Sequence, residues 1–305
     1  MKTFRTLAIA GAAVAYALAL LGSWTRINGA GMTCPDWPLC RGAVVPALQG
    51  GVVLEWMHRA LAGLESLVVV AAIVVGWRLR GRIAGLGGLL AVLGALLVLQ
   101  IALGGITILQ SNSPLSVMFH WGAAMLLLMT FTALAIVAVV AERGEATAFA
   151  WRPDTVWLAI ATAWAFATMC AGAFVSSSGA GLACPSFPNC GDGFFGQTIP
   201  QALQMTHRLL AGAFIVFAVV AVVMVPLAAR RATVALRIGL VLLTLQVVLG
   251  VLNVFLALPP LLREAHAANA VATFIAFVAS TVLAGIARSP EHIPWNERRG
   301  GLQPG

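Results

Sequence analysis

Long apolar stretches alternate with short polar loops along nearly the whole chain. Stretches of about 20 apolar residues are long enough to cross about 30 Å of hydrocarbon, and none of them shows the strict alternation of a strand. Only helices and closed barrels satisfy their backbone hydrogen bonds within a bilayer. The pattern therefore predicts eight transmembrane helices, approximately at Leu7–Leu21, Val52–Val75, Ile83–Leu109, Val117–Ala141, Val156–Val175, Ala202–Ala229, Val234–Leu258 and Ala265–Ala287.

The composition supports a membrane protein and excludes a soluble one. Of 305 residues, 61% are hydrophobic and 9% are charged, whereas soluble domains carry about 25% charged residues. The net charge of +8 could favour nucleic acid, but the basic residues stand in short loops between the apolar stretches. We therefore expect the lipid bilayer as a partner and no nucleic acid.

The basic residues also predict the orientation, because cytoplasmic loops are rich in Lys and Arg. With the N-terminus in the cytoplasm, the outside holds only Arg26, Arg41, Arg59, Arg208 and Arg263. The inside then holds Lys2, Arg5, Arg78, Arg80, Arg82, Arg143, Arg152, Arg230, Arg231, Arg237, Arg288, Arg298 and Arg299. This predicts a multi-pass protein of the cell (inner) membrane with both termini in the cytoplasm.

An internal repeat divides the chain into two halves. The segment GAGMTCPDWPLC at 29–40 matches GAGLACPSFPNC at 179–190, with seven of twelve positions identical at an offset of 150. Each repeat contains four predicted helices, so both halves insert with the same orientation. We expect two tandem, parallel, pseudo-symmetric four-helix bundles, at residues 1–148 and 149–290, followed by a cytoplasmic tail at 291–305. The first helix resembles a secretory signal, but its internal counterpart indicates that it is retained.

Four of the five histidines lie within predicted transmembrane helices. The repeat aligns His58 with His207 and His120 with His266, whereas His292 falls in the tail and is expected at the surface. Each half thus has two imidazoles at matching depth on different helices, as the two axial ligands of a heme iron require. Hydrogen bonding between helices and a bare metal ion with the loop cysteines or Glu55 as further ligands are the alternatives.

Two arginines directly follow histidines. Arg59 and Arg208 stand next to His58 and His207, and an arginine fork suits a heme propionate. Both side chains could equally extend to the outer interface.

The cysteines form two pairs with the same spacing. Cys34 and Cys40 lie in the first outer loop, and Cys184 and Cys190 lie in the third. Because the outer side of such a membrane is oxidising, we expect the disulfides Cys34–Cys40 and Cys184–Cys190, acting as loop staples or in a redox reaction. Cys170 lies within a helix and is expected to be inert.

The halves differ at one position that carries chemistry. Glu55 precedes His58 by three residues and shares its helix face, and its counterpart in the second half is Gln204. A carboxylate beside a heme can take a proton or stabilise positive charge, and an amide cannot. Glu55 is therefore the candidate catalytic residue of a reactive first half, unless it only stabilises the positive end of its helix.

From the first helix through His266, the chain resembles the heme A synthase family. The resemblance is carried by Glu55, His58 and Arg59, by His120, by Thr206-His207-Arg208, by His266 and by the paired cysteine loops. It implies an oxidoreductase that converts heme O to heme A by oxidising the C8 methyl group to a formyl group through successive hydroxylation and loss of water. The second cysteine pair departs from the pattern of many members.

The resemblance also implies where the hemes bind. Heme B would be resident between His207 and His266, and heme O or heme A would occupy His58 and His120 as substrate or product. Further partners would be the heme O synthase, an electron acceptor and a second copy in a homo-oligomer.

Two other classes of protein share many of these features. A diheme b-type electron carrier linked to quinol would need the same histidines and helices. That function would not explain why the first half has Glu55 where the second half has Gln204. A heme transporter or chaperone would need a release path.

Overall fold

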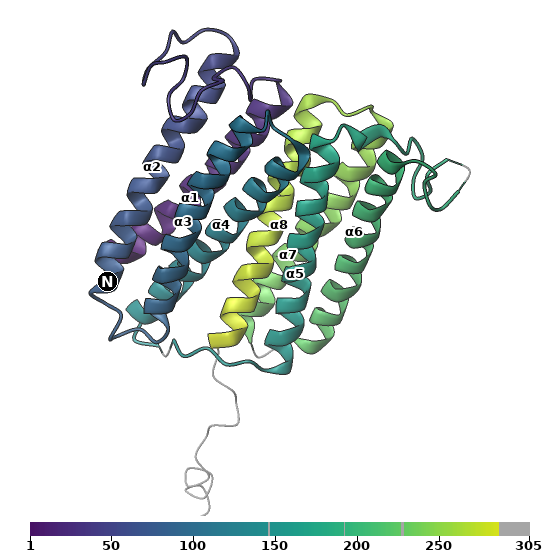
Figure 1. The fold of residues 1–305 in the computed structure, drawn as a ribbon. Helices are drawn as coiled ribbons and strands as arrows, with labels where there is room; N and C mark the ends of the chain where they lie inside the picture. The colour runs from purple at the N-terminus through teal and green to yellow at the C-terminus, as the bar shows by residue number, and fades with distance from the viewer. Residues whose placement is uncertain (146, 192, 227–228, 287–305) are drawn as a thin grey trace, which may run out of the picture.

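The computed structural model describes residues 1–145, 147–191, 193–226 and 229–286. The predicted tail at 291–305, with His292, Arg298 and Arg299, lies outside the described residues, as do Ala287 and Arg288. Within the described ranges the chain is all-helical (Figure 1). The long helices are α1 (Lys2–Ile27), α2 (Gly51–Trp77), α3 (Leu86–Leu109), α4 (Pro114–Glu142), α5 (Pro153–Ser177), α6 (Ile199–Met224), α7 (Arg230–Phe255) and α8 (Pro260–Ile286), with a short 3₁₀ turn, η1, at Ala180–Leu182.

All eight long helices in the described ranges are long and apolar enough to cross a membrane. The predicted all-α membrane fold is therefore confirmed. Prolines begin α4, α5 and α8, where the missing N–H costs nothing because the first turn has no partner for it. Ser113 caps α4 by accepting a hydrogen bond from the backbone N–H of Ser116.

Several predicted helix ends differ from the observed ones. The apolar stretch Ala202–Ala229 predicts a helix that continues through Pro226, but α6 ends at Met224. The residue before a proline is driven out of helical geometry, and Val225 is accordingly extended. At the other end of the chain, α1 begins at Lys2, because a helix can continue into polar residues that an apolar pattern does not count.

The helices form two groups of four side by side, α1–α4 and α5–α8 (Figure 1). Helices α4 and α8 lie at the centre, where they contact each other, and their central segments are mostly buried. Across the same interface α4 contacts α5, and its counterpart α8 contacts α1. The predicted boundary at 148/149 falls in the connection between α4 and α5. The pseudo-symmetry and the two-domain division stay predictions.

Polar contacts join the two halves. The guanidinium of Arg26, near the end of α1, donates hydrogen bonds to the hydroxyl and the carbonyl oxygen of Ser176, near the end of α5. These two residues are counterparts in the repeat. The hydroxyl of Tyr16 in α1 donates a hydrogen bond to the carbonyl oxygen of Ala268 in α8 at 3.3 Å.

The two ends of the bundle differ in character. The start of α1 and the end of α8 lie at one end, and both cysteine loops lie at the opposite end (Figure 1). At the first end Arg5 pairs with Glu142, and Arg231 pairs with Glu145 at 2.8 Å. We call the opposite end the cysteine-loop end. All four helices that carry the intramembrane histidines begin there.

Candidate functional site

The four histidines lie at similar depth below the cysteine-loop end. His58 of α2, His120 of α4, His207 of α6 and His266 of α8 each fall in the second or third turn of their helix. The imidazoles of His58 and His120 lie close enough to interact electrostatically. Those of His207 and His266 do the same. The structure therefore brings the predicted pairs together within each half.

Every one of these rings packs against a glycine on the neighbouring helix. A Cβ atom built on Gly22 of α1 would lie 2.8 Å from Cε1 of His58, and one on Gly172 of α5 would lie 3.0 Å from Cε1 of His207. The same distance is 3.3 Å from Gly104 of α3 to His120, and 3.2 Å from Gly250 of α7 to His266. We call Gly22, Gly104, Gly172 and Gly250 the glycine notches. They leave room for an imidazole where a side chain would push it away.

The notches also bring the rings next to backbone carbonyls. Nδ1 of His207 lies 3.1 Å from the carbonyl oxygen of Thr168, four residues before Gly172. In a helix that carbonyl lies beside the side chain four residues later, so a glycine there leaves it accessible. The backbone groups that interact with the other three rings stand at the same spacing from their notches: Leu18 with His58, Gln100 with His120 and Gln246 with His266.

The contacts differ in strength between the halves. Nδ1 of His58 and Nδ1 of His120 are buried and form no full hydrogen bond within the described part of the chain. In the second half, the amide of Gln246 lies 3.1 Å from Nε2 of His266 and accepts a 2.7 Å hydrogen bond from Asn269. The counterparts of these two residues are Gln100, whose Oε1 is buried without a partner in the described residues, and Ala123. The first half is therefore less fully hydrogen-bonded around its histidines.

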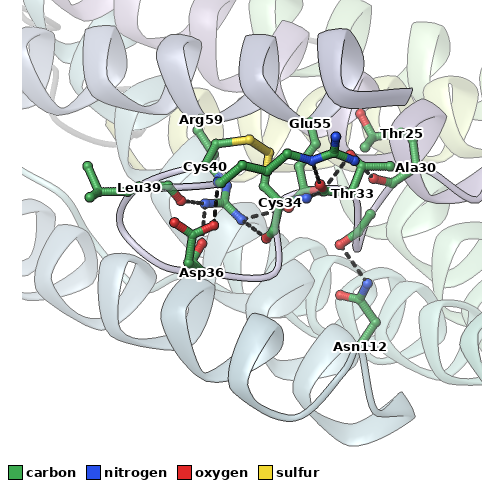
Figure 2. Close-up of polar contacts among 12 residues, drawn as sticks. Thr25, Ala30, Thr33, Cys34, Asp36, Leu39, Cys40, Glu55, Arg59 and Asn112 are labelled. Carbon is green, nitrogen blue, oxygen red and sulfur yellow. Dashed lines mark hydrogen bonds and ion pairs between the residues drawn. A yellow bond between two sulfur atoms is a disulfide. The ribbon is translucent and has the colours of Figure 1, made fainter. Parts of the chain in front are cut away.

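Glu55 connects helix α2 to the first cysteine loop (Figure 2). Its side chain is 3% exposed. One carboxylate oxygen accepts hydrogen bonds from the hydroxyl of Thr33 at 2.9 Å and the backbone N–H of Cys34 at 2.8 Å. The other pairs with Arg59 at 2.6 Å. The carboxylate is thus held by the loop and by its own helix.

Gln204 occupies the same place in the second half. Its Oε1 accepts a hydrogen bond from the backbone N–H of Cys184 at 2.6 Å, and its amide donates to the carbonyl of Gly181 at 2.9 Å. Both residues therefore support a cysteine loop, and only Glu55 adds a negative charge.

The two arginines that follow histidines also bind the loops. Arg59 donates to the carbonyl oxygens of Cys34, at 2.7 Å, and of Asp36 and Leu39 (Figure 2). Arg208 donates to the carbonyls of Ser186, Pro188, Asn189 and Cys184. Their predicted contact with propionates stays a prediction, and the contacts present show a structural role as loop clamps.

Each loop closes on a disulfide, as predicted. Cys34 is bonded to Cys40 and Cys184 to Cys190, and Cys170 is free. The carboxylate of Asp36 accepts hydrogen bonds from the backbone N–H groups of Gly42 and Arg41. These bonds, that of Gly42 above all, and the charge of Arg59 hold the pKa of Asp36 below its usual value.

Known proteins resemble this chain over most of its length. The sequence model of the cytochrome oxidase assembly protein family, COX15-CtaA, matches residues 5–278. The chain belongs to this family. It is 31% identical to a heme A synthase of Symbiobacterium thermophilum, and the match covers 76% of this chain and 78% of that protein. It is 27% identical to heme A synthases of Bacillus licheniformis, over 81% and 84% of the two chains, and of Geobacillus thermodenitrificans, over 81% and 80%.

The sequence interpretation missed several residues that line the site. The glycine notches recur with the repeat offsets of 150 and 146 residues, so the repeat itself was a signal for them. Gln246 recurs as Gln100 at the offset of 146 and so had the same signal. Asn269 aligns with Ala123 and had none, because its contact with Gln246 depends on how α7 and α8 are rotated against each other. Glu65, a buried carboxyl two turns below His58, shares its helix face and could have been found by that spacing.

Alanine at Gly22 or Gly172 is expected to displace a histidine ring. The added Cβ would lie too close to Cε1, and overpacking a dense site costs about 1–3 kcal/mol. We expect a shifted Soret band or reduced heme content and a lower melting temperature, measured on purified protein.

Gly63→Ala and Gly212→Ala are the matched controls, since these glycines lie on α2 and α6, and a Cβ there meets no atom within 4 Å. Equal effects of the control and notch substitutions would contradict the notch interpretation.

Thiol labelling tests the disulfides. Protein denatured without reductant should react with a maleimide only at Cys170, because the four loop cysteines are bonded in pairs. Reduction before labelling is the control and should expose all five cysteines. Labelling of all five without reduction would contradict the pairing.

Proposed function

We propose that this chain is a heme A synthase, a membrane oxidoreductase that converts heme O to heme A. Each of two hydroxylations of the same methyl carbon adds the oxygen of a water molecule and releases two protons and two electrons, which pass to an electron acceptor. The resulting geminal diol loses water to give the formyl group. The observation that carries the proposal is the pair of histidines in each half, held at one depth in glycine notches, in a member of a family whose relatives are heme A synthases.

We assign the substrate heme to His58 and His120, and a resident heme B to His207 and His266. The histidine nitrogens of each pair are suitable ligands for heme iron. A carbonyl beside Nδ1, as Thr168 provides for His207, favours the tautomer that leaves Nε2 free for iron, and metal-bound histidines usually have such a partner. A resident heme B would supply one-electron transfer from the reacting half to the acceptor.

The second half fits a permanent cofactor better than the first. Asn269 holds Gln246 and Thr168 holds His207, so these two groups are fixed in advance. The amide of Gln246 lies 3.1 Å from Nε2 of His266 and would have to turn away for that nitrogen to bind iron. Around His58 and His120 the corresponding polar atoms lack such contacts in the described residues. Groups that become fully bonded only when a heme binds suit a substrate that enters and leaves.

Glu55 is the proposed catalytic residue. Oxidation of the methyl group builds positive charge at that carbon, and a buried carboxylate nearby stabilises it. Its two oxygens already bind Thr33, Cys34 and Arg59. Proton abstraction would require one of these partners to be exchanged, whereas electrostatic stabilisation would not. The geometry therefore favours the electrostatic role.

The remaining assignments follow from this function. The protein would lie in the cell membrane with both termini in the cytoplasm and with the cysteine loops outside. It would receive heme O from the heme O synthase, pass electrons to an acceptor and form homo-oligomers. Arg59 and Arg208 would reach propionates only if they release some of their loop carbonyls.

Histidine substitutions test the two sites separately. His207→Ala or His266→Ala should remove most of the b-type absorbance and lower the melting temperature, because each would remove a residue that holds the resident heme. His58→Ala or His120→Ala should abolish heme A formation and leave most heme B bound. Purified protein gives the spectra, and extracted heme gives the product. An unchanged spectrum in His207→Ala would overturn the assignment of the second half.

The Glu55→Gln variant distinguishes a catalytic role of Glu55 from its structural role in holding the first cysteine loop. The second half shows that Gln204 supports a cysteine loop, so the variant should fold and bind both hemes. Lost charge stabilisation or acid–base help should lower heme A formation by about 10²–10⁴-fold. The measurement is the heme composition of cells that carry the variant as their only copy.

Gln204→Glu is the matched control and should leave heme A formation nearly unchanged. Wild-type heme A in Glu55→Gln cells would mean that Glu55 only supports its loop.

A further inference from the structure

Glu65 is a buried carboxyl in the middle of helix α2. Its side chain is 3% exposed, and neither carboxyl oxygen has a hydrogen-bond partner among the described residues. It stands seven residues after His58, which places it on the same helix face and about 10 Å deeper along the axis. Side chains of a helix tilt towards its N-terminus, so the carboxyl is directed back towards the histidine.

The second half has no such carboxyl. The counterpart of Glu65 is Phe214, which is 5% exposed and packs edge-on against Phe277, with ring centroids 5.0 Å apart. The counterpart of Phe277 is Phe131, whose ring lies directly against Gly11 of α1. Below its histidines, the second half thus has an aromatic pair at the position where the first half has a carboxyl.

A buried carboxyl without a partner is costly. Ionisable groups within a membrane are expensive and usually serve a function, and a buried polar group without a hydrogen bond is less stable than the same group in water. The second half has Phe214 at the equivalent position, so a four-helix half can form without a carboxyl there. Glu65 therefore points to a ligand that supplies the missing partner.

The chemistry of the substrate indicates that partner, and this step rests on the proposed function. Heme propionates are charged and favour the aqueous interface at the cysteine-loop end, one to two turns above the histidines. The opposite edge of the ring then faces the hydrocarbon interior, on the side of Glu65. In heme O, the substituent far from the propionates is a hydroxyethylfarnesyl group, with one hydroxyl beside the ring and an apolar tail. Heme B carries a vinyl group there.

We propose that Glu65 accepts a hydrogen bond from the hydroxyl of the hydroxyethylfarnesyl group and so selects heme O over heme B in the first half. Phe214 offers no polar atom at the equivalent place, which suits a heme without that hydroxyl. The broken symmetry between Glu65 and Phe214 thus assigns the two hemes to the two halves.

Heme titration of purified holoprotein tests this assignment. Heme O and heme B are added separately, binding is followed in the Soret region, and binding that persists in His58→Ala is subtracted. Wild-type protein should bind heme O at least about tenfold more tightly than heme B at this site. Glu65→Leu should weaken heme O by about tenfold, the usual effect of leaving one buried polar group unpaired, and leave heme B unchanged. Glu65→Gln should retain most of the preference.

Phe214→Leu is the matched control in the other half and should leave the preference unchanged. An equal loss for both hemes in Glu65→Leu, or no loss for either, would overturn the assignment. If the wild type converts heme O and Glu65→Leu still prefers heme O to heme B, the role of Glu65 is refuted and the synthase function stands. If the preference for heme O depends on Glu65 but the wild type does not convert heme O to heme A, the synthase function is refuted and the role of Glu65 stands. Absence of heme binding in the wild type would refute both.

Discussion

The contact between each histidine ring and a glycine on the next helix is the constraint on which the site depends. An imidazole within the bilayer needs a partner for Nδ1, and water is not available there. In the notch of Gly172 the carbonyl of Thr168 meets this need for His207, whereas Nδ1 of His58 and Nδ1 of His120 have no hydrogen-bond partner among the described residues. The same glycine brings two helices close enough for the ring to reach across. The helix spacing and the position of the ring therefore both depend on one glycine in each notch.

The cysteine loops fix the same helices from above. Glu55 and Gln204 accept hydrogen bonds from the N–H of the first cysteine in each loop, and Arg59 and Arg208 bind the loop carbonyls. These residues stand within one turn of His58 and His207, so the cap and the histidine pair are parts of one rigid unit. The disulfide within each loop limits the conformations that the loop can adopt. A loop held in this way restrains the outer ends of α2 and α6 and hence the depth of both rings.

The helices, the histidine pairs and the disulfides were predictable from the sequence because they follow regular patterns along the chain. The apolar stretches predicted the helices, and the repeat predicted the histidine pairs and the disulfides, since both signals follow from position along the chain alone. Contacts between helices were not predictable, because a small rotation of α7 or α8 would separate Gln246 from Asn269. The predicted end of α6 was wrong for a local reason, because a pattern of hydrophobic residues does not include the backbone constraint that Pro226 imposes. Glu55 was singled out for its charge, and its hydrogen bonds to the loop emerged only from the structure.

The packing below the two histidine pairs shows why similar halves can serve different purposes. In the second half Trp164 stacks on Phe217 with centroids 5.4 Å apart, and Phe166 lies 6.2 Å from Phe274. The repeat places Val14, Val68, Tyr16 and Leu128 at these positions in the first half. Aromatic pairs contribute about 0.5–1.5 kcal/mol beyond their buried area and have few rotamers, so they form a stiff wall. Three of these four first-half residues are aliphatic, and aliphatic side chains adapt more easily to a bulky apolar tail. A stiff half suits a cofactor that stays, and an adaptable half with an unpaired carboxyl suits a substrate that must enter, be recognised and leave.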